Sequence, residues 1–163
     1  MKNKLSHYDS QGRARMVDVS EKSATKRTAV ATAVVRMSPK VLAALPENPK
    51  GDPFEVARVA GIMAAKRTSE LVPMCHPIPL AHVDVHLELC ENGVRIRATA
   101  STTAVTGVEM EAMTAACIAA LTVYDMCKAL DKGIEIREVV LESKSGGKSG
   151  LYRRRRPEKA LPK

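Results

Sequence analysis

The sequence predicts an α+β fold, a ferredoxin-like plait in which helices cover an antiparallel sheet. Residues 82–90 and 94–101 each alternate apolar and polar side chains, and the turn sequence Glu-Asn-Gly at 91–93 separates them. This pattern is typical of a β-hairpin. A helical pattern precedes the hairpin and a long apolar helix follows it, with a strand at each end. The resulting order β-α-β-β-α-β is that of the plait.

The first strand is expected over 27–37 (RTAVATAVVRM), which is rich in Val, Thr and Ala. Ser38 and Pro39 then provide an N-cap and a first-turn proline for a short helix. Residues 45–53 are rich in turn formers and indicate a loop.

A longer helix is predicted over 52–67, with Asp52 as its N-cap and Pro53 at its first position. Glu55 would complete a capping box. Apolar residues at helical spacing predict the buried face of this helix: Phe54, Val59, Ile62 and Met63. Residues 71–80 contain three prolines and must run extended.

The final elements are a helix over 108–130 (VEMEAMTAACIAALTVYDMCKAL) and a strand over 134–144. We expect one catalytic domain, 1–150, followed by a basic, disordered tail, 151–163. The chain of 163 residues contains three Tyr, one Phe and no Trp, so its core must be aliphatic and rich in alanine. Chains with such thin cores often gain stability by forming oligomers.

The formal net charge of +8 is concentrated in the tail, where the last thirteen residues hold six basic side chains and one acidic one. A nucleic-acid partner is disfavoured, because the chain has few aromatic rings on which bases could stack. The four cysteines show no C-x-x-C spacing and indicate reduced thiols. With no apolar run long enough to span a membrane and no signal segment, a cytoplasmic location is expected.

Charged residues on the apolar helix are the first candidates for function. Thr106 and Glu109 fit a capping box, so Glu109 has a structural explanation. Glu111 has none. Asp125 and Lys128 are three residues apart and can pair, either as a surface salt bridge or as a partly buried acid–base unit with shifted pKa values.

The spacing of these residues limits how they can act together. Glu111 and Asp125 are fourteen residues apart, which is about 21 Å along a helix at ~1.5 Å per residue. One compact site within one chain cannot use both. Either they have different roles, or Glu111 of one subunit approaches Asp125 of another.

Other segments indicate an anionic ligand. The proline segment fixes His76 beside Cys75, where substrate binding or acid–base chemistry is favoured over a metal site, because no further ligands stand at metal-site spacing. The sequence KSGGKSG at 144–150 combines flexible backbone amides with two lysines. Lys50 and Lys66 lie near helix ends. Together these features predict a phosphorylated small molecule as substrate.

Three stretches resemble the signature blocks of the MoaC family, the molybdenum cofactor biosynthesis protein C family. They are AGIMAAKRTSELVPMCHPIPL, TGVEMEAMTAACIAALTVYDMCK and KSGGKSG. The resemblance covers about residues 6–150. It implies a ferredoxin-like hexamer, a trimer of dimers with active sites at subunit interfaces. It also implies a cyclic pyranopterin monophosphate synthase activity, which follows a radical GTP cyclase and converts 3′,8-cyclo-7,8-dihydroguanosine triphosphate into cyclic pyranopterin monophosphate and diphosphate.

The resemblance also assigns residues. Asp125 and Lys128 match the catalytic pair of the family. Substrate-binding or triphosphate-binding positions match Met74, Cys75, His76, Met110, Glu111, Lys50, Lys66, Lys144 and Arg27. No cofactor and no protein-bound metal are expected, although a divalent cation accompanying the triphosphate stays open.

Two other readings compete with this one. A basic RNA-binding module would hold nucleic acid through its tail, but it leaves Glu111 and Asp125 unexplained. A phosphate-cleaving hydrolase would use the glycine-rich loop, but it would need acids grouped around a metal.

Overall fold

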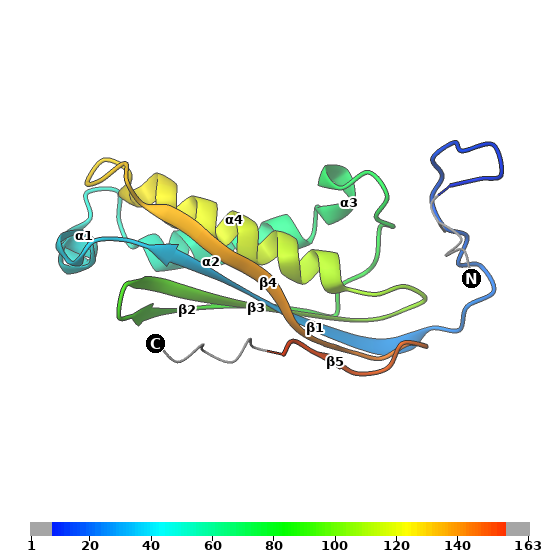
Figure 1. Cartoon of the computed structure of the whole chain (residues 1–163). Helices are drawn as coiled ribbons and strands as arrows, with labels where there is room; N and C mark the ends of the chain where they lie inside the picture. The colour runs from blue at the N-terminus through cyan, green and yellow to red at the C-terminus, as the bar shows by residue number, and fades with distance from the viewer. Residues whose placement is uncertain (1–7, 156–163) are drawn as a thin grey trace, which may run out of the picture.

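A five-stranded sheet with the order β2-β3-β1-β4-β5 forms one layer of the molecule (Figure 1). The computed structural model describes residues 8–155, and every neighbouring pair of strands in it is antiparallel. The strands are β1 (Thr25–Arg36), β2 (His82–Cys90), β3 (Gly93–Ala104), β4 (Glu135–Ser145) and β5 (Tyr152–Arg153). The order of the first four is that of a ferredoxin-like plait, so the predicted fold class is confirmed.

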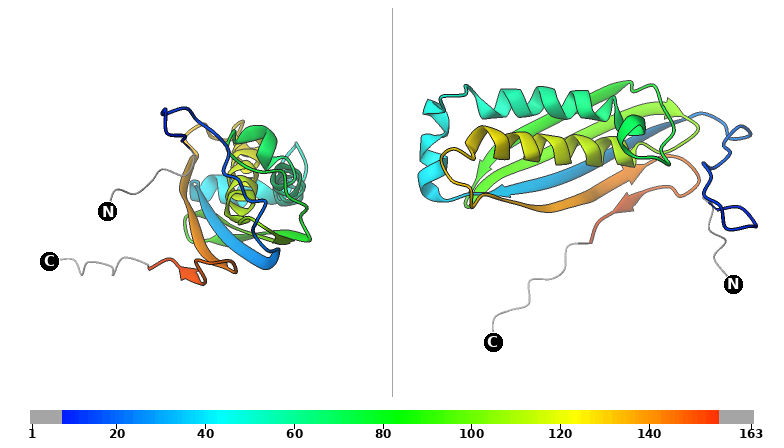
Figure 2. Two further views of the ribbon diagram at one scale, coloured as in Figure 1. Left: turned by 90° about the vertical axis from the view of Figure 1, so that its right-hand side faces the viewer. Right: turned by 90° about the horizontal axis from the view of Figure 1, so that it is seen from above.

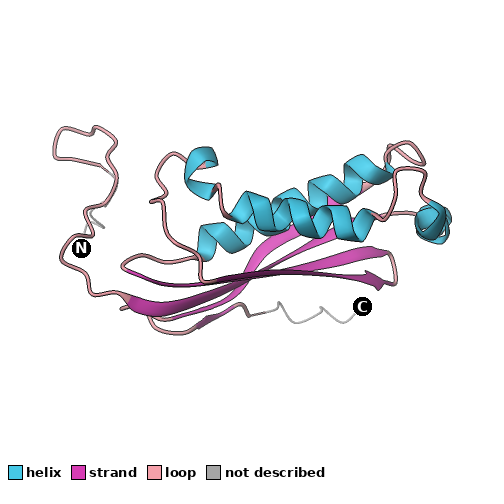
Figure 3. Cartoon of the chain, turned by 180° about the vertical axis from the view of Figure 1, so that it is seen from behind, coloured by secondary structure: helices cyan, strands magenta, loops and turns pink. Residues whose placement is uncertain are grey.

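The helices form a second layer on one face of this sheet, as Figures 2 and 3 show. They are α1 (Pro39–Ala44), the 3₁₀ turn η1 (Leu45–Glu47), α2 (Pro53–Ala65), α3 (Thr68–Leu71) and α4 (Glu109–Cys127). In the view from above, α2 and α4 lie side by side over the strands. The predicted hairpin is also confirmed, since β2 and β3 pair from Cys90 and Gly93 onward.

Small side chains form the contact between α2 and α4. The side of α4 that faces inward is made of fully buried alanines: Ala112, Ala115, Ala116, Ala119 and Ala120. Opposite them, a Cβ atom added to Gly61 would lie 2.9 Å from the Ala115 carbonyl oxygen and 3.3 Å from the Ala119 Cβ. The two helices are therefore as close as glycine and alanine allow.

This close approach overturns the face predicted for α2. The fully buried positions of the helix are mostly small: Pro53, Ala57, Gly61, Ala64 and Ala65. Val59 and Met63 are instead 54% and 49% exposed, and Phe54 and Ile62 are only partly buried. Spacing alone favoured the larger side chains, but the helix turns its small residues toward α4, where larger ones would not fit.

Both predicted capping boxes are incomplete. The Asp52 carboxylate accepts a hydrogen bond from the Phe54 amide at 2.8 Å, as an N-cap should, but Glu55 pairs with Arg58 instead. At the start of α4 the N-cap is Val108, without a side-chain cap bond, so the prediction for Thr106 and Glu109 was wrong. The helix begins two residues later than an N-cap at Thr106 would require.

The apolar character of α4 has a structural explanation. Contrary to the expectation from the sequence, its 19 residues are long and apolar enough to cross a membrane, but about half of that stretch is buried. It packs against α2 and the sheet, which is the position of a core helix. Composition alone therefore gives little reason to assign it to a membrane.

The sheet continues into the predicted tail. Tyr152 and Arg153 pair with Lys144 and Ser143, so the folded part extends past the predicted boundary at residue 150. The rest of the tail, 156–163, lies outside the described residues, and its predicted disorder stays a prediction.

We expect Gly61→Ala to destabilise the protein. In an exposed helix this change would add up to about 1 kcal/mol of stability, because alanine favours helices. Here the new methyl group would meet the Ala115 carbonyl, and overpacking costs about 1–3 kcal/mol. The thermal midpoint should therefore fall. Lys40→Ala, at an exposed position of α1, is the control and should change the midpoint little. A rise in the midpoint for Gly61→Ala would contradict the proposed contact.

Candidate active site

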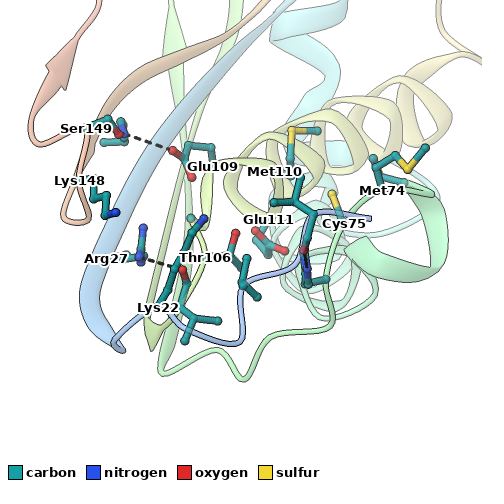
Figure 4. A pocket seen from close by; sticks show the side chains of 17 residues that line it. Lys22, Arg27, Met74, Cys75, Thr106, Glu109, Met110, Glu111, Lys148 and Ser149 are labelled. Atoms are coloured by element: carbon teal, nitrogen blue, oxygen red, sulfur yellow. Dashed lines mark hydrogen bonds and ion pairs between the residues drawn. The ribbon is translucent and has the colours of Figure 1, made fainter. Parts of the chain in front are cut away.

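A cavity of about 760 Å³ opens at the end of the molecule where α4 begins (Figure 4). Segments far apart in the sequence meet there: 17–22 before β1, the proline segment after α3, the loop before α4, and the glycine-rich loop after β4. The residues that line it and bear functional groups are Lys22, Arg27, Cys75, His76, Thr106, Glu109, Glu111, Lys144, Lys148 and Ser149.

Glu111 is the buried acid of this cavity. It lies in the first turn of α4 and is only 4% exposed. Burial raises the pKa of its carboxyl above the usual value, and the neighbouring Glu109 carboxylate raises it further. No cation forms an ion pair with it within residues 8–155. Glu111 is therefore more easily protonated than an ordinary glutamate and can donate a hydrogen bond to a ligand.

Cys75 and His76 lie beside this carboxyl group. Burial raises the pKa of the Cys75 thiol, and the nearby Glu111 raises it further, so the thiol form is favoured. The His76 Nε2 atom lies 2.8 Å from the Val17 carbonyl oxygen. A carbonyl can only accept, so Nε2 carries a proton and His76 ties the segment at 17–22 to the cavity wall.

Cations form the opposite wall. Arg27 donates to the carbonyl oxygens of Ala104 and Val105, each at 3.0 Å, which holds its guanidinium at the cavity. The Lys144 Nζ atom lies 3.7 Å from a Glu109 carboxylate oxygen and also contacts Ser149. Gly147 has a φ of +69°, and a Cβ there would overlap the Arg27 guanidinium. Glycine at this position therefore lets the loop approach Arg27.

A second charged cluster lies at the other end of α4. The Asp125 carboxylate is 2.6 Å from the Lys128 Nζ atom and 3.2 Å from the Lys50 Nζ atom. Lys50 also donates to the Asp125 carbonyl oxygen at 2.9 Å. The predicted pairing of Asp125 and Lys128 is confirmed, and their separation from Glu111 agrees with the helical spacing.

Of the two alternatives for this pair, the single chain has the surface salt bridge and not the partly buried unit, because the Asp125 and Lys128 side chains are 54% and 50% exposed. Hydrogen bonds from Lys128 and Lys50 lower the pKa of Asp125. The hydrogen bond to Asp125 raises the pKa of Lys128. Each partner therefore stabilises the charged form of the other.

The predicted site residues thus fall into two groups. The cavity brings together Arg27, Met74, Cys75, His76, Met110, Glu111 and Lys144. Lys50 joins Asp125 and Lys128, and its amino group reaches the end of α4 instead of the nearby start of α2. Lys66 lies exposed at the end of α2 and lines neither site.

Several lining residues were not predicted individually. Lys148 and Ser149 belong to the glycine-rich loop, so the motif that indicated anion binding could have identified them. Lys22 lies in a segment without a regular pattern, and nothing in the sequence signalled its approach to the cavity. Across residues 8–155, no three His, Cys, Asp or Glu side chains converge as a metal site would require.

Comparison with known proteins decides the family. A sequence profile of the MoaC family matches residues 16–147. The chain belongs to the MoaC family. Curated relatives named cyclic pyranopterin monophosphate synthase include that of Brevibacillus brevis, which is 54% identical over 157 residues, 94% of this chain and 98% of the relative.

Two further MoaC relatives are equally similar. The cyclic pyranopterin monophosphate synthase of Streptomyces griseus is 54% identical over 158 residues, covering 96% of this chain and 89% of its own length. Cyclic pyranopterin monophosphate synthase 1 of Mycobacterium bovis is 54% identical over 153 residues, covering 92% and 90%. The likeness to this MoaC chain thus spans nearly the whole protein in each case.

The raised pKa of Glu111 predicts a pH-dependent effect of Glu111→Gln. Below the ordinary glutamate value of 4.5 the carboxyl is protonated in both folded and unfolded states. As the pH rises above this value, the unfolded state loses the proton more readily, so Glu111 reduces stability. Between pH 4.5 and pH 7.5, the thermal midpoint of Glu111→Gln should therefore rise relative to that of the wild type. An equal difference at the two pH values would contradict the raised pKa.

Proposed function

We propose that this protein converts 3′,8-cyclo-7,8-dihydroguanosine 5′-triphosphate into cyclic pyranopterin monophosphate and diphosphate, a lyase step of molybdenum cofactor biosynthesis. The observation that carries the proposal is the cavity at the start of α4, which combines a buried carboxyl group with a wall of cations. The names of relatives that are 54% identical over almost the whole chain give the same reaction product.

The cavity suits the two chemically different parts of this substrate. Its guanine-derived ring presents amide and amino groups, which Glu111 can recognise as a hydrogen-bond donor or acceptor. Its triphosphate carries several negative charges, and the cations of the opposite wall are Lys22, Arg27, Lys144 and Lys148. We infer that the ring lies near the start of α4 and the phosphates near the glycine-rich loop.

The cluster of Asp125 is suited to the reacting part of the substrate. Closing the cyclic phosphate forms a bond between a substrate hydroxyl oxygen and the α-phosphorus and breaks the bond to the departing diphosphate. The lowered pKa of Asp125 keeps its carboxylate ionised and able to accept a proton. The Lys128 and Lys50 ammonium groups can stabilise the charge that develops on diphosphate.

Both clusters can serve one reaction only if two subunits combine them. We propose a homohexamer, a trimer of dimers, in which Asp125 of one subunit approaches Glu111 of another. Apolar side chains of α2 and α4 support this assembly, because they remain exposed in the single chain. They are Val56, Val59 and Met63 of α2, Leu121 of α4, and Met110, which also lines the cavity.

The remaining parts of the proposal concern surroundings and partners. A cytoplasmic location is supported by the four cysteines, which are all free thiols. The functional partner is the radical GTP cyclase that supplies the cyclised nucleotide. The protein contributes no cofactor in this proposal, and a divalent cation could enter together with the triphosphate.

Asp125→Asn and Lys128→Ala should each abolish or nearly abolish turnover while the fold is retained. Loss of a proton-transferring group typically lowers kcat by about 10²–10⁴. Diphosphate and pterin formation from the cyclised nucleotide are measured, and circular dichroism checks the fold. Glu135→Gln, at another exposed ion pair, is the control and should keep full activity. Turnover near the wild-type value in either site variant would refute the assignment.

Mixing two variants that each lose one carboxyl group tests whether subunits share the site. Glu111→Ala, which removes the group that recognises the ring and should also abolish turnover, and Asp125→Asn subunits are unfolded and refolded together, so that hybrid dimers form. If each site takes one residue from each chain, random mixing restores roughly a quarter of the sites. Activity no higher than that of the separate variants would instead show that no site combines Glu111 of one subunit with Asp125 of another.

A further inference from the structure

One extra residue in β4 determines where Lys144 points. Opposite β1, Val30 pairs with Ser143 and Ala31 pairs with Leu141, so Glu142 has no partner of its own. This irregularity is a β-bulge, in which two residues of one strand oppose one residue of the next.

The bulge changes the face that the end of β4 presents. Leu141 packs against the helix-covered core, and it pairs with the buried Ala31. In a regular strand, a residue three positions later would point to the opposite face. Lys144 instead pairs with Ala29, which is buried on the same helix-covered side. Lys144 therefore reaches Glu109 and the cavity because Glu142 is accommodated as an extra residue.

Contacts from two directions hold the extra residue. The Arg154 amide donates to the Glu142 carbonyl oxygen at 2.8 Å, which continues the pairing of β4 with β5 by one residue and holds the bulge from that side. The Glu142 carboxylate accepts from the Thr32 hydroxyl at 3.2 Å and lies 3.7 Å from the Arg154 guanidinium. Thr32 belongs to β1, and Arg154 follows directly after β5.

The segment that supplies Arg154 also fixes the two residues after the bulge. β5 runs back along β4 (Figure 1), and Tyr152 pairs with Lys144 itself. The glycine-rich loop is thereby closed as the connection of a hairpin. The family profile ends at residue 147, so this returning strand lies beyond the matched region.

We propose that Glu142 and the segment at 152–154 are positioning elements for the phosphate-binding side of the site. They stabilise the bulge that aims Lys144 into the cavity, and they do not touch the substrate themselves. The inference rests on the proposed function, in which the cations of the cavity hold the triphosphate. It implies that the binding of a polyphosphate group depends on β5.

Binding of inorganic diphosphate, measured by titration calorimetry, tests this arrangement without requiring turnover. Lys144→Ala should weaken binding about tenfold or more, as expected for loss of a charged hydrogen-bond partner. Glu142→Ala should weaken it to a similar extent, and Glu142→Gln, which can still accept from Thr32, should restore much of the loss. Arg154→Ala should weaken binding several-fold, whereas the neighbouring Arg155→Ala should not.

The double variant decides whether Glu142 acts through Lys144. If it does, Glu142→Ala should cause little further loss of diphosphate affinity once Lys144 is already alanine. Losses that multiply, or an unchanged affinity of Glu142→Ala, would overturn the inference. If Glu142→Ala does not fold, the same comparison is made with Arg154→Ala. Losses of diphosphate affinity that multiply when Arg154→Ala and Lys144→Ala are combined would also overturn the inference.

The same measurements separate this inference from the proposed function. If the wild-type protein forms the pterin product but the variants show no coupling between Glu142 and Lys144, only the positioning role is refuted. If the variants show the coupling in diphosphate binding but the wild-type protein forms no product from the cyclised nucleotide, only the assigned reaction is refuted.

Discussion

The contact between Gly61 and the alanines of α4 is the constraint on which the rest of the structure depends. It brings two helices close together over a sheet whose covered face is also built from small and branched aliphatic residues. With so few aromatic side chains, the core gains its stability from close packing of small groups. A helix held this closely is a rigid support, and both charged clusters are fixed to it.

The two ends of α4 create opposite environments for their acids. Glu111 is buried and lies near the Glu109 carboxylate, so its carboxyl retains a proton more easily. Asp125 is exposed between two lysines, so its carboxylate stays ionised. One helix therefore carries a carboxyl that tends to retain its proton and another that stays ionised, and the difference comes from their surroundings.

Local patterns in the sequence predicted the strands, the hairpin, the helix order and hence the fold. The predictions were wrong where the burial of a side chain depended on residues distant in the sequence. Val59 and Met63 had the spacing of a buried face, but α4 accepts only small residues on that side. The exposure of Asp125 and Lys128 likewise depends on what surrounds the end of α4. The resemblance supplied most of the cavity residues, whereas Lys22 required the three-dimensional arrangement.

The bulge in β4 limits how the glycine-rich loop could be transplanted into a designed protein. A designer who copied KSGGKSG onto the end of a regular strand, with the same number of residues after the last core position, would place its first lysine on the wrong side of the sheet. The transferable unit is larger than the motif: it includes the extra residue at 142, its threonine partner on the adjacent strand and the returning strand that holds its carbonyl. A short motif that can be recognised by eye therefore depends on residues that no inspection of the motif would reveal.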